Sequence, residues 1–181
     1  MPRVTLIDAQ AASGESKSLL DDITATFGTT PAMFKAVANS PAALKMMWAA
    51  FGALGGGRLG AKLGEQIAVL VADRNSCEYC LAAHTALGRK AGVPASEMSQ
   101  AQAGHSADPR VNAALGFAAK LVDSRAQVSD ADVEALRAAG FDDEEIVEIV
   151  AHVALNLFTN YVNVALSVPL DFPKVALRGA A

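Results

Sequence analysis

The feature that most constrains the fold is a regular division of apolar, alanine-rich stretches by glycine and proline. Within each stretch the apolar side chains recur every three to four residues, which is the period of an amphipathic helix. Glycine or proline stands at most of the ends, where helices commonly stop or start. Only 6% of the residues are aromatic, and alanine favours helices over strands. The pattern predicts an all-α chain without strand pairs.

Capping residues and helix breakers set the expected ends of the helices. The expected helices cover residues 15–27, 31–37, 41–54, 63–74, 77–91, 94–102, 109–125, 131–139 and 143–166. Asn75 and Ser76 form the short turn before the fifth helix and are expected to cap it. Glu65 is expected in the first turn of the fourth helix.

The length of 181 residues predicts a single domain. The three glycines at 55–57 mark the largest break in the helical pattern. We therefore divide the domain, residues 1–181, into an N-terminal helical segment (1–57), a central core (58–105) and a second helical half (106–170).

Composition and charge exclude several classes of protein. The chain is 52% hydrophobic with a net charge of −4, which is too apolar for a disordered chain. Lysine and arginine form no cluster, so we expect no nucleic-acid partner. The longest apolar run near the centre, residues 67–72, is too short to span a membrane, and the N-terminus lacks the pattern of a signal peptide. We expect a cytoplasmic protein with no membrane partner, where two cysteines have a role other than a structural disulfide.

The residues most able to carry chemistry are Cys77, Cys80 and His84. A C-x-x-C at the start of a helix brings two sulfurs within bonding reach, and the positive end of the helix dipole favours thiolate over thiol. His84 lies one helical turn after Cys80 and two after Cys77, so the three side chains share one face. An imidazole at this position can take the proton of a thiol and later return it to a leaving group.

Glu65 lies on the preceding helix, which the short turn forces to pack antiparallel. Its carboxylate is expected to reach His84, to fix the tautomer of the imidazole and to raise its basicity. A solvated carboxylate near the start of a helix is the alternative interpretation of Glu65.

Simpler explanations of the cysteine pair remain open. Free cysteines pack readily in a core, and a zinc site would require a fourth ligand and a better tetrahedral geometry than one helix face provides. Haem attachment requires a histidine directly after the second cysteine, and a thioredoxin fold requires strands. We expect neither a metal ion nor an organic cofactor.

The spacing E-x₁₁-C-x-x-C-x-x-x-H in an all-α chain resembles the AhpD-like alkylhydroperoxidase and carboxymuconolactone decarboxylase superfamily, in particular its peroxidase-related branch. Other parts of the chain are similar to that branch as well: Phe27-Gly28-x-x-Pro31-x-x-Phe34, Ser40-Pro41, Asn156-x-Phe158 and Asn160-Tyr161-x-Asn163. The resemblance covers roughly residues 15–173.

The resemblance implies an AhpD-like helical fold, a homo-oligomer such as a trimer or hexamer, and antioxidant, thiol-dependent reduction of hydroperoxides with an external dithiol as reductant. It implies that Cys80 attacks the peroxide, that Cys77 is the resolving thiol, and that His84 and Glu65 form a proton relay. The chain departs from well-studied members in having Tyr79 where they have a histidine directly before the second cysteine.

Two other functions are weighed against peroxide reduction. One is a carboxymuconolactone decarboxylase-like lactone enzyme, which needs no cysteine pair. The other is a non-enzymatic oligomer whose dithiol switches its assembly. The order of attack is also open, because in thioredoxin-type proteins the more N-terminal thiol, here Cys77, is the exposed one that exchanges with the reductant.

Three further patterns yield expectations. Residues 65–72 resemble residues 144–151 at an offset of 79, through either an internal duplication or a chance match of two helices, and a duplication would align Cys77, Cys80 and His84 with Asn156, Thr159 and Asn163. His152, between apolar neighbours, is expected to be a core or interface histidine with its polar atoms satisfied. The apolar group formed by Met46, Met47, Trp48 and Phe51 is expected in the core, at a subunit interface or on a pocket wall.

Overall fold

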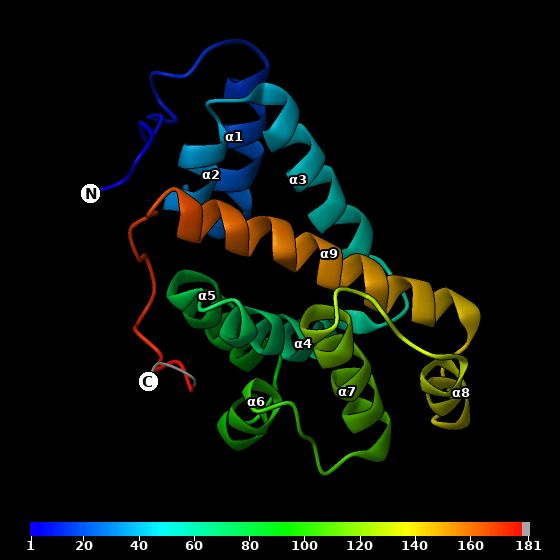
Figure 1. The fold of residues 1–181 in the computed structure, drawn as a ribbon. Helices are drawn as coiled ribbons and strands as arrows, with labels where there is room; N and C mark the ends of the chain where they lie inside the picture. Colours follow the sequence, from blue (N-terminus) through cyan, green and yellow to red (C-terminus); the bar gives the residue numbers. More distant parts are fainter. Residues whose placement is uncertain (179–181) are drawn as a thin grey trace.

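The computed structural model describes residues 1–178, and helices make up its regular structure (Figure 1). In chain order the helices are α1 (Gly14–Phe27), α2 (Ala32–Val37), α3 (Pro41–Gly55), α4 (Gly60–Arg74), α5 (Glu78–Lys90), α6 (Ala95–Gln102), α7 (Pro109–Asp123), α8 (Asp130–Ala138) and α9 (Asp143–Ala165). Residues 1–178 contain no strand, so the predicted all-α fold is confirmed.

Most helix ends follow the capping residues of the sequence. Ser40 accepts a hydrogen bond from the backbone N–H of Ala43 at 3.2 Å, and Pro41 occupies the first turn of α3. Gly28 ends α1 in the left-handed conformation (φ 77°), which glycine adopts without a steric penalty. Local sequence therefore sets these boundaries.

Most helix ends lie within two residues of the prediction, and two differences bear on the residues of interest. Helix α4 begins at Gly60, three residues earlier than expected, which places Glu65 in its second turn. Gly64 is tolerated inside this helix because the ring of His152 packs against it, and a Cβ atom there would lie 3.0 Å from His152 Cε1. Cys77 itself, rather than Asn75 or Ser76, is the N-cap of α5, and Asn75 instead ends α4.

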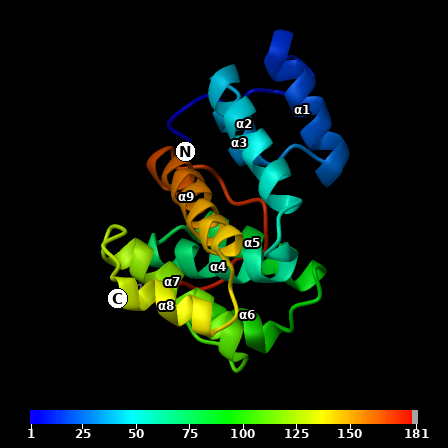
Figure 2. The same cartoon turned by 90° about the vertical axis from the view of Figure 1, so that its right-hand side faces the viewer.

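Helix α4 is the centre of the fold. It is buried along most of its length and contacts α5, α6, α7 and α9. Helix α9 crosses between α1–α3 on one side and α4–α7 on the other, as the two perpendicular views show (Figures 1 and 2). The inner face of α5 therefore meets both α4 and α9, and this junction holds the residues of interest.

The segment after α9 forms no helix or strand, but it is tied to the rest of the molecule. It runs past α5 towards α6 (Figure 1). Asp171 accepts hydrogen bonds from the N–H of Ala32 at 2.6 Å and from the hydroxyl of Tyr79 at 2.7 Å. Lys174 forms an ion pair with Glu78 at 3.0 Å. We refer to residues 167–178 as the C-terminal strap.

None of the helices within residues 1–178 has both the length and the apolar character needed to cross a membrane. The division of the domain into segments 1–57, 58–105 and 106–170 stays a prediction, as does the internal duplication.

Candidate active site

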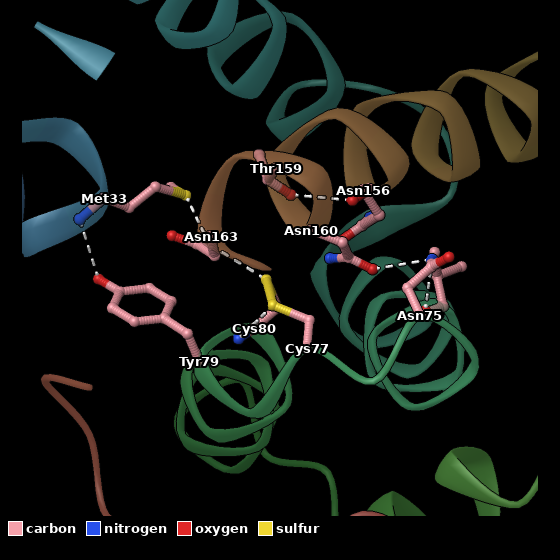
Figure 3. Close-up of a disulfide and its surroundings, with 10 residues drawn as sticks. Met33, Asn75, Cys77, Tyr79, Cys80, Asn156, Thr159, Asn160 and Asn163 are labelled. Carbon is pink, nitrogen blue, oxygen red and sulfur yellow. Dashed lines mark hydrogen bonds between the residues drawn. A yellow bond between two sulfur atoms is a disulfide. The ribbon is translucent and has the colours of Figure 1, made fainter. Parts of the chain in front are cut away.

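The two cysteines lie at the N-terminus of α5 and are joined by a disulfide bond (Figure 3). The sulfur of Cys77 caps the helix by accepting a hydrogen bond from the backbone N–H of Cys80 at 3.2 Å. The prediction that C-x-x-C brings the sulfurs within bonding reach is confirmed. Cys77 is 1% exposed and Cys80 is 2% exposed, so the expectation that Cys77 is an exposed thiol does not hold in this disulfide form.

His84 and Glu65 meet as the antiparallel packing of α4 and α5 predicts. The Nδ1 atom of His84 lies 2.8 Å from Oε2 of Glu65. Their side chains are 13% and 21% exposed, respectively, so Glu65 is not a solvated surface carboxylate. When Nδ1 carries the proton and donates a hydrogen bond to Glu65, Nε2 of the imidazole is left free to act as a base.

A cavity of about 410 Å³ opens beside Cys80. Cys80, His84 and Glu65 contribute to its wall, whereas Cys77 does not line it. The remaining wall is mainly aromatic and aliphatic and is formed by Phe27, Pro31, Met33, Phe34, Trp48, Phe51, Leu87 and Phe172, with Thr26, Tyr79, Thr159 and Asn163 as polar or partly polar members. No lysine or arginine among residues 1–178 lines this cavity. It fits an apolar ligand without a negative charge.

The aromatic part of the wall is a packed cluster from α1, α2 and α3. The ring of Phe34 lies edge-on to Trp48 at 5.8 Å and also packs against Phe27 and Phe51. From the sequence, the apolar group on α3 is expected in the core, at a subunit interface or on a pocket wall. Trp48 and Phe51 lie on the pocket wall. Met47 lies in the core and Met46 is exposed.

Tyr79, at the position where the resembling family has a histidine, anchors the C-terminal strap. Its hydroxyl donates to Asp171, and its ring lies edge-on to Phe172 at 5.8 Å. Burial raises the pKa of Tyr79 far above its usual value, and the hydrogen bond and charge of Asp171 raise it further. Tyr79 therefore stays protonated at neutral pH and does not act as a base.

Asp171 and Phe172 were not predicted from the sequence. Phe172 lines the cavity, and Asp171 fixes the strap beside it. They follow Pro169 in a stretch without helical periodicity, so no local signal points to them.

Asn163 on α9 also reaches the site. Its Nδ2 atom lies 3.2 Å from the sulfur of Cys80 and 3.2 Å from the sulfur of Met33 (Figure 3). Asn163 is a functional candidate that the sequence does not reveal. Two patterns include Asn163, namely the Asn160-Tyr161-x-Asn163 motif and the offset of 79 residues that aligns it with His84, but neither indicates a contact with sulfur.

A second, smaller cavity of about 130 Å³ lies behind the relay pair and is lined by Glu65, His84 and His152, among others. The Nε2 atom of His152 is buried and has no hydrogen-bond partner among the described residues. The expectation that the polar atoms of His152 are satisfied is therefore wrong. Burial is the main cause that lowers the pKa of His152, although the charges of Glu148 and Glu65 act in the opposite direction.

Within the described part of the chain, no group of three or more His, Cys, Asp or Glu side chains is arranged to hold a metal ion. What the residues offer is a sulfur pair, an imidazole–carboxylate pair and an amide donor beside an apolar cavity. This set can carry thiol chemistry coupled to the transfer of a proton.

Comparisons with known proteins agree with the geometry. Residues 41–123, which include the cysteine motif, match the model of the Carboxymuconolactone decarboxylase family. A peroxidase-related protein from Silicibacter sp. TM1040 is 28% identical, with a TM-score of 0.81 over 98% of this chain and 94% of its own. An AhpD-core, peroxidase-related protein from Ralstonia eutropha JMP134 is 26% identical, with a TM-score of 0.83 over 94% of this chain and 92% of its own.

A more distant structure shows the same fold. It is a cysteine-to-alanine variant of the debrominase Bmp8 in complex with 2,3,4-tribromopyrrole, 18% identical, with a TM-score of 0.78 over 93% of this chain and 91% of its own. No curated protein gives a significant match. The family match over residues 41–123 and the structures that share both the fold and the peroxidase-related description support a place for the chain in the AhpD-like and carboxymuconolactone decarboxylase superfamily.

Proposed function

We propose that this protein reduces organic hydroperoxides, with Cys77 and Cys80 as a redox-active dithiol that an external dithiol restores. The observation that carries the proposal is the position of Cys80. Its side chain lines an apolar cavity together with His84, whose ring is held by Glu65 at 2.8 Å.

The cycle begins with the reduced protein. His84 takes the proton of the Cys80 thiol, and the thiolate attacks the terminal oxygen of the hydroperoxide. An S–O bond forms as the O–O bond breaks, so that sulfur loses two electrons to the peroxide. The alkoxide leaves with the proton held by His84, and Cys80 becomes a sulfenic acid.

Cys77 then closes the cycle. Its sulfur attacks the sulfur of Cys80, an S–S bond forms, the S–O bond breaks, and the hydroxyl leaves as water with the proton of Cys77. An external dithiol reduces the disulfide by two exchange steps. The roles of Cys80 as the attacking thiol and of Cys77 as the resolving thiol are supported by the cavity, which Cys80 lines and Cys77 does not.

The chemistry of the cavity favours this function over lactone decarboxylation. A decarboxylase substrate carries a carboxylate, and a carboxylate placed in an apolar site needs a cationic or multiple hydrogen-bonding partner. In the described part of the chain, no lysine or arginine lines the cavity. An uncharged alkyl or aryl hydroperoxide meets no such penalty.

We also propose that the protein forms a homo-oligomer. Large apolar side chains are exposed on α9, namely Val147, Val150, Tyr161 and Val164, and Met46 is exposed on α3. Exposed apolar side chains on neighbouring helices are typical of subunit contacts.

The proposal is tested by supplying cumene hydroperoxide and dithiothreitol and measuring loss of the peroxide. We expect turnover by the wild-type protein and no turnover by Cys80→Ser. Cys77→Ser is treated with cumene hydroperoxide without dithiothreitol, because a dithiol also reduces a sulfenic acid, and we expect a single sulfenic acid on Cys80, trapped with dimedone and located by mass spectrometry. Unchanged peroxide consumption in Cys80→Ser would contradict the proposal. A change of oligomer size with the redox state, without any turnover, would instead support the redox-switched oligomer.

A further inference from the structure

The side chain of Asn163 contacts the sulfur atom that the proposed reaction uses. Its Nδ2 atom lies 3.2 Å from Cys80 Sγ. The sulfur of Met33, also at 3.2 Å, is the other partner of the same NH₂ group. Sulfur accepts hydrogen bonds weakly when neutral and far more strongly as an anion. The contact to Cys80 therefore strengthens when the disulfide is opened and that sulfur becomes a thiolate.

The carboxamide is held in an incompletely satisfied state. Asn163 is 4% exposed, and its Oδ1 atom is buried without a hydrogen-bond partner. In Figure 3 the NH₂ end faces the sulfurs, while the oxygen turns towards the side of Met33 and Tyr79. A buried polar group with an unpaired acceptor is unfavourable for folding, and such groups are concentrated at functional sites. A purely structural role would be served better by an apolar side chain of similar size.

The sulfurs of Cys77 and Cys80 accept hydrogen bonds from different donors, and Asn163 is the side-chain donor to Cys80. The sulfur of Cys77 accepts from the backbone N–H of Cys80 at 3.2 Å, whereas Asn163 donates to Cys80. Thr159, which also lines the cavity, directs its hydroxyl to the backbone oxygen of Asn156 at 3.1 Å instead. The hydroxyl groups of Thr26 and Tyr79 are likewise engaged, with the backbone oxygen of Asp22 and with Asp171. No hydroxyl on the wall formed by the described residues therefore points to the sulfur, and the NH₂ group of Asn163 does.

We propose that Asn163 is a catalytic residue whose side-chain NH₂ group donates a hydrogen bond to the thiolate of Cys80 and then to the oxygen of the sulfenate formed there. No bond to Asn163 forms or breaks. The residue stabilises negative charge first on sulfur and then on the oxygen transferred to it, while the protons move through His84. The first role stands by itself, and the second rests on the proposed reduction of hydroperoxides.

The experiment separates the two roles. In the Cys77→Ser background, Cys80 is the only cysteine, so its alkylation by iodoacetamide can be followed against pH without a competing thiol. Asn163→Leu removes the donor with little change in size. Asn163→Asp preserves the shape but replaces the donor by a negative charge. Asn160→Leu is the matched control, because Asn160 is also buried on α9 and bonds to Asn75 rather than to sulfur.

We expect Asn163→Leu to raise the alkylation midpoint of Cys80 by about one pH unit, equivalent to about a tenfold loss of thiolate below the midpoint. Asn163→Asp is expected to raise it further, and Asn160→Leu to leave it unchanged. The rate of sulfenic acid formation with cumene hydroperoxide should fall at least as much as the thiolate fraction. Met33→Leu, which removes the other sulfur, should leave the midpoint unchanged and so exclude an effect of packing alone.

An unchanged midpoint in both Asn163 variants, with near-ultraviolet circular dichroism showing that they are folded, would overturn the inference. Should Asn163→Leu fail to fold, Asn163→Asp alone decides the outcome. In another outcome, the wild-type protein fails to reduce hydroperoxides while the Asn163 variants still raise the midpoint. That result would contradict the proposed function and support the role of Asn163 in stabilising the thiolate. Rapid peroxide reduction by the wild-type protein, with an unchanged midpoint in the Asn163 variants, would support the proposed function and contradict the role of Asn163.

Discussion

The two halves of α9 treat their polar side chains in opposite ways. In the first half, Glu145 pairs with Arg110 at 2.7 Å and completes a capping box with Asp142. The carboxylate of Glu148 accepts hydrogen bonds from the backbone N–H groups of Arg58 at 2.8 Å and Leu59 at 3.1 Å. In the part of α9 from His152 onward, which we take as its second half, three buried polar atoms have no partner. They are the only such atoms within residues 1–178, and they are His152 Nε2, Asn160 Nδ2 and Asn163 Oδ1.

This difference indicates that the two halves of α9 have different roles. Buried polar groups are nearly always hydrogen-bonded where they serve stability alone. Exceptions are expected where a protein departs from good packing for the sake of function. The first half of α9 fixes the helix to the rest of the fold, whereas the second half presents incompletely satisfied groups to the cysteines and to the relay pair.

The largest expected effect is a loss of catalytic rate on removal of the base, His84, from the candidate active site, which the second half of α9 faces. His84→Gln should lower kcat/KM for cumene hydroperoxide by about 10² to 10⁴, the usual contribution of a general base. Glutamine retains a polar side chain of similar length, so folding should be preserved. Steady-state kinetics across pH measure the effect, and a wild-type rate in His84→Gln would show that the relay is not used.

Stability should respond in opposite ways to substitutions in the two halves. Glu145→Ala removes both the ion pair with Arg110 and half of the capping box, and should lower the free energy of unfolding by about 1–2 kcal/mol. Asn160→Leu removes a carboxamide whose Nδ2 is unpaired, together with the bond that its Oδ1 accepts from Asn75. Asn75 keeps its bond to the backbone oxygen of Val71, so the substitution should be neutral or stabilising within about 1 kcal/mol. Urea unfolding measures both. Equal destabilisation by the two substitutions would remove the contrast between the halves.

A smaller effect is expected at the loop that Glu148 holds. A Cβ atom at Gly57 would lie 2.8 Å from the carboxylate oxygens of Glu148, so Gly57→Ala should displace that carboxylate and lower the free energy of unfolding by about 1 kcal/mol. Gly56→Ala is the matched control, because its Cβ would meet nothing closer than 3.7 Å. Thermal unfolding of both variants tests the prediction, which fails if they are equally stable.

The smallest effect concerns pH. Burial lowers the pKa of His152 below its usual 6.5, so the unfolded chain takes up a proton there at a higher pH than the folded chain does. The stability that His152 contributes is present above pH 6.5 and is lost as the pH falls below that value towards the folded pKa. His152→Asn should therefore lose less stability than the wild type between pH 7 and 5. Urea unfolding at several pH values measures the difference, and parallel curves would contradict it.

The sequence could predict much of the fold because the helix ends are encoded locally. Capping residues such as Ser40 and Asp142 and breakers such as Gly28 act through their immediate neighbours. The start of α4 was missed because Gly60 and Gly64 disfavour a helix by themselves, and the contact of Gly64 with His152 arises only in the folded chain.

The candidate site divides in the same way. The contact between Glu65 and His84 could be predicted, because a short turn joins their helices and spacing places both on facing sides. Asn163 and Asp171 could not, since they reach α5 across 83 and 92 residues of sequence. Their positions depend on how α9 and the strap pack, and no local pattern specifies that packing.

The most direct test of the account is the pH dependence of thiol alkylation in the reduced wild-type protein, read by mass so that Cys77 and Cys80 are followed separately. An activated site beside the cavity predicts that Cys80 has an apparent pKa well below the ordinary thiol value of about 8.5, and that Glu65→Gln raises it. Two thiols that both titrate near 8.5, with no response to Glu65→Gln, would contradict the account.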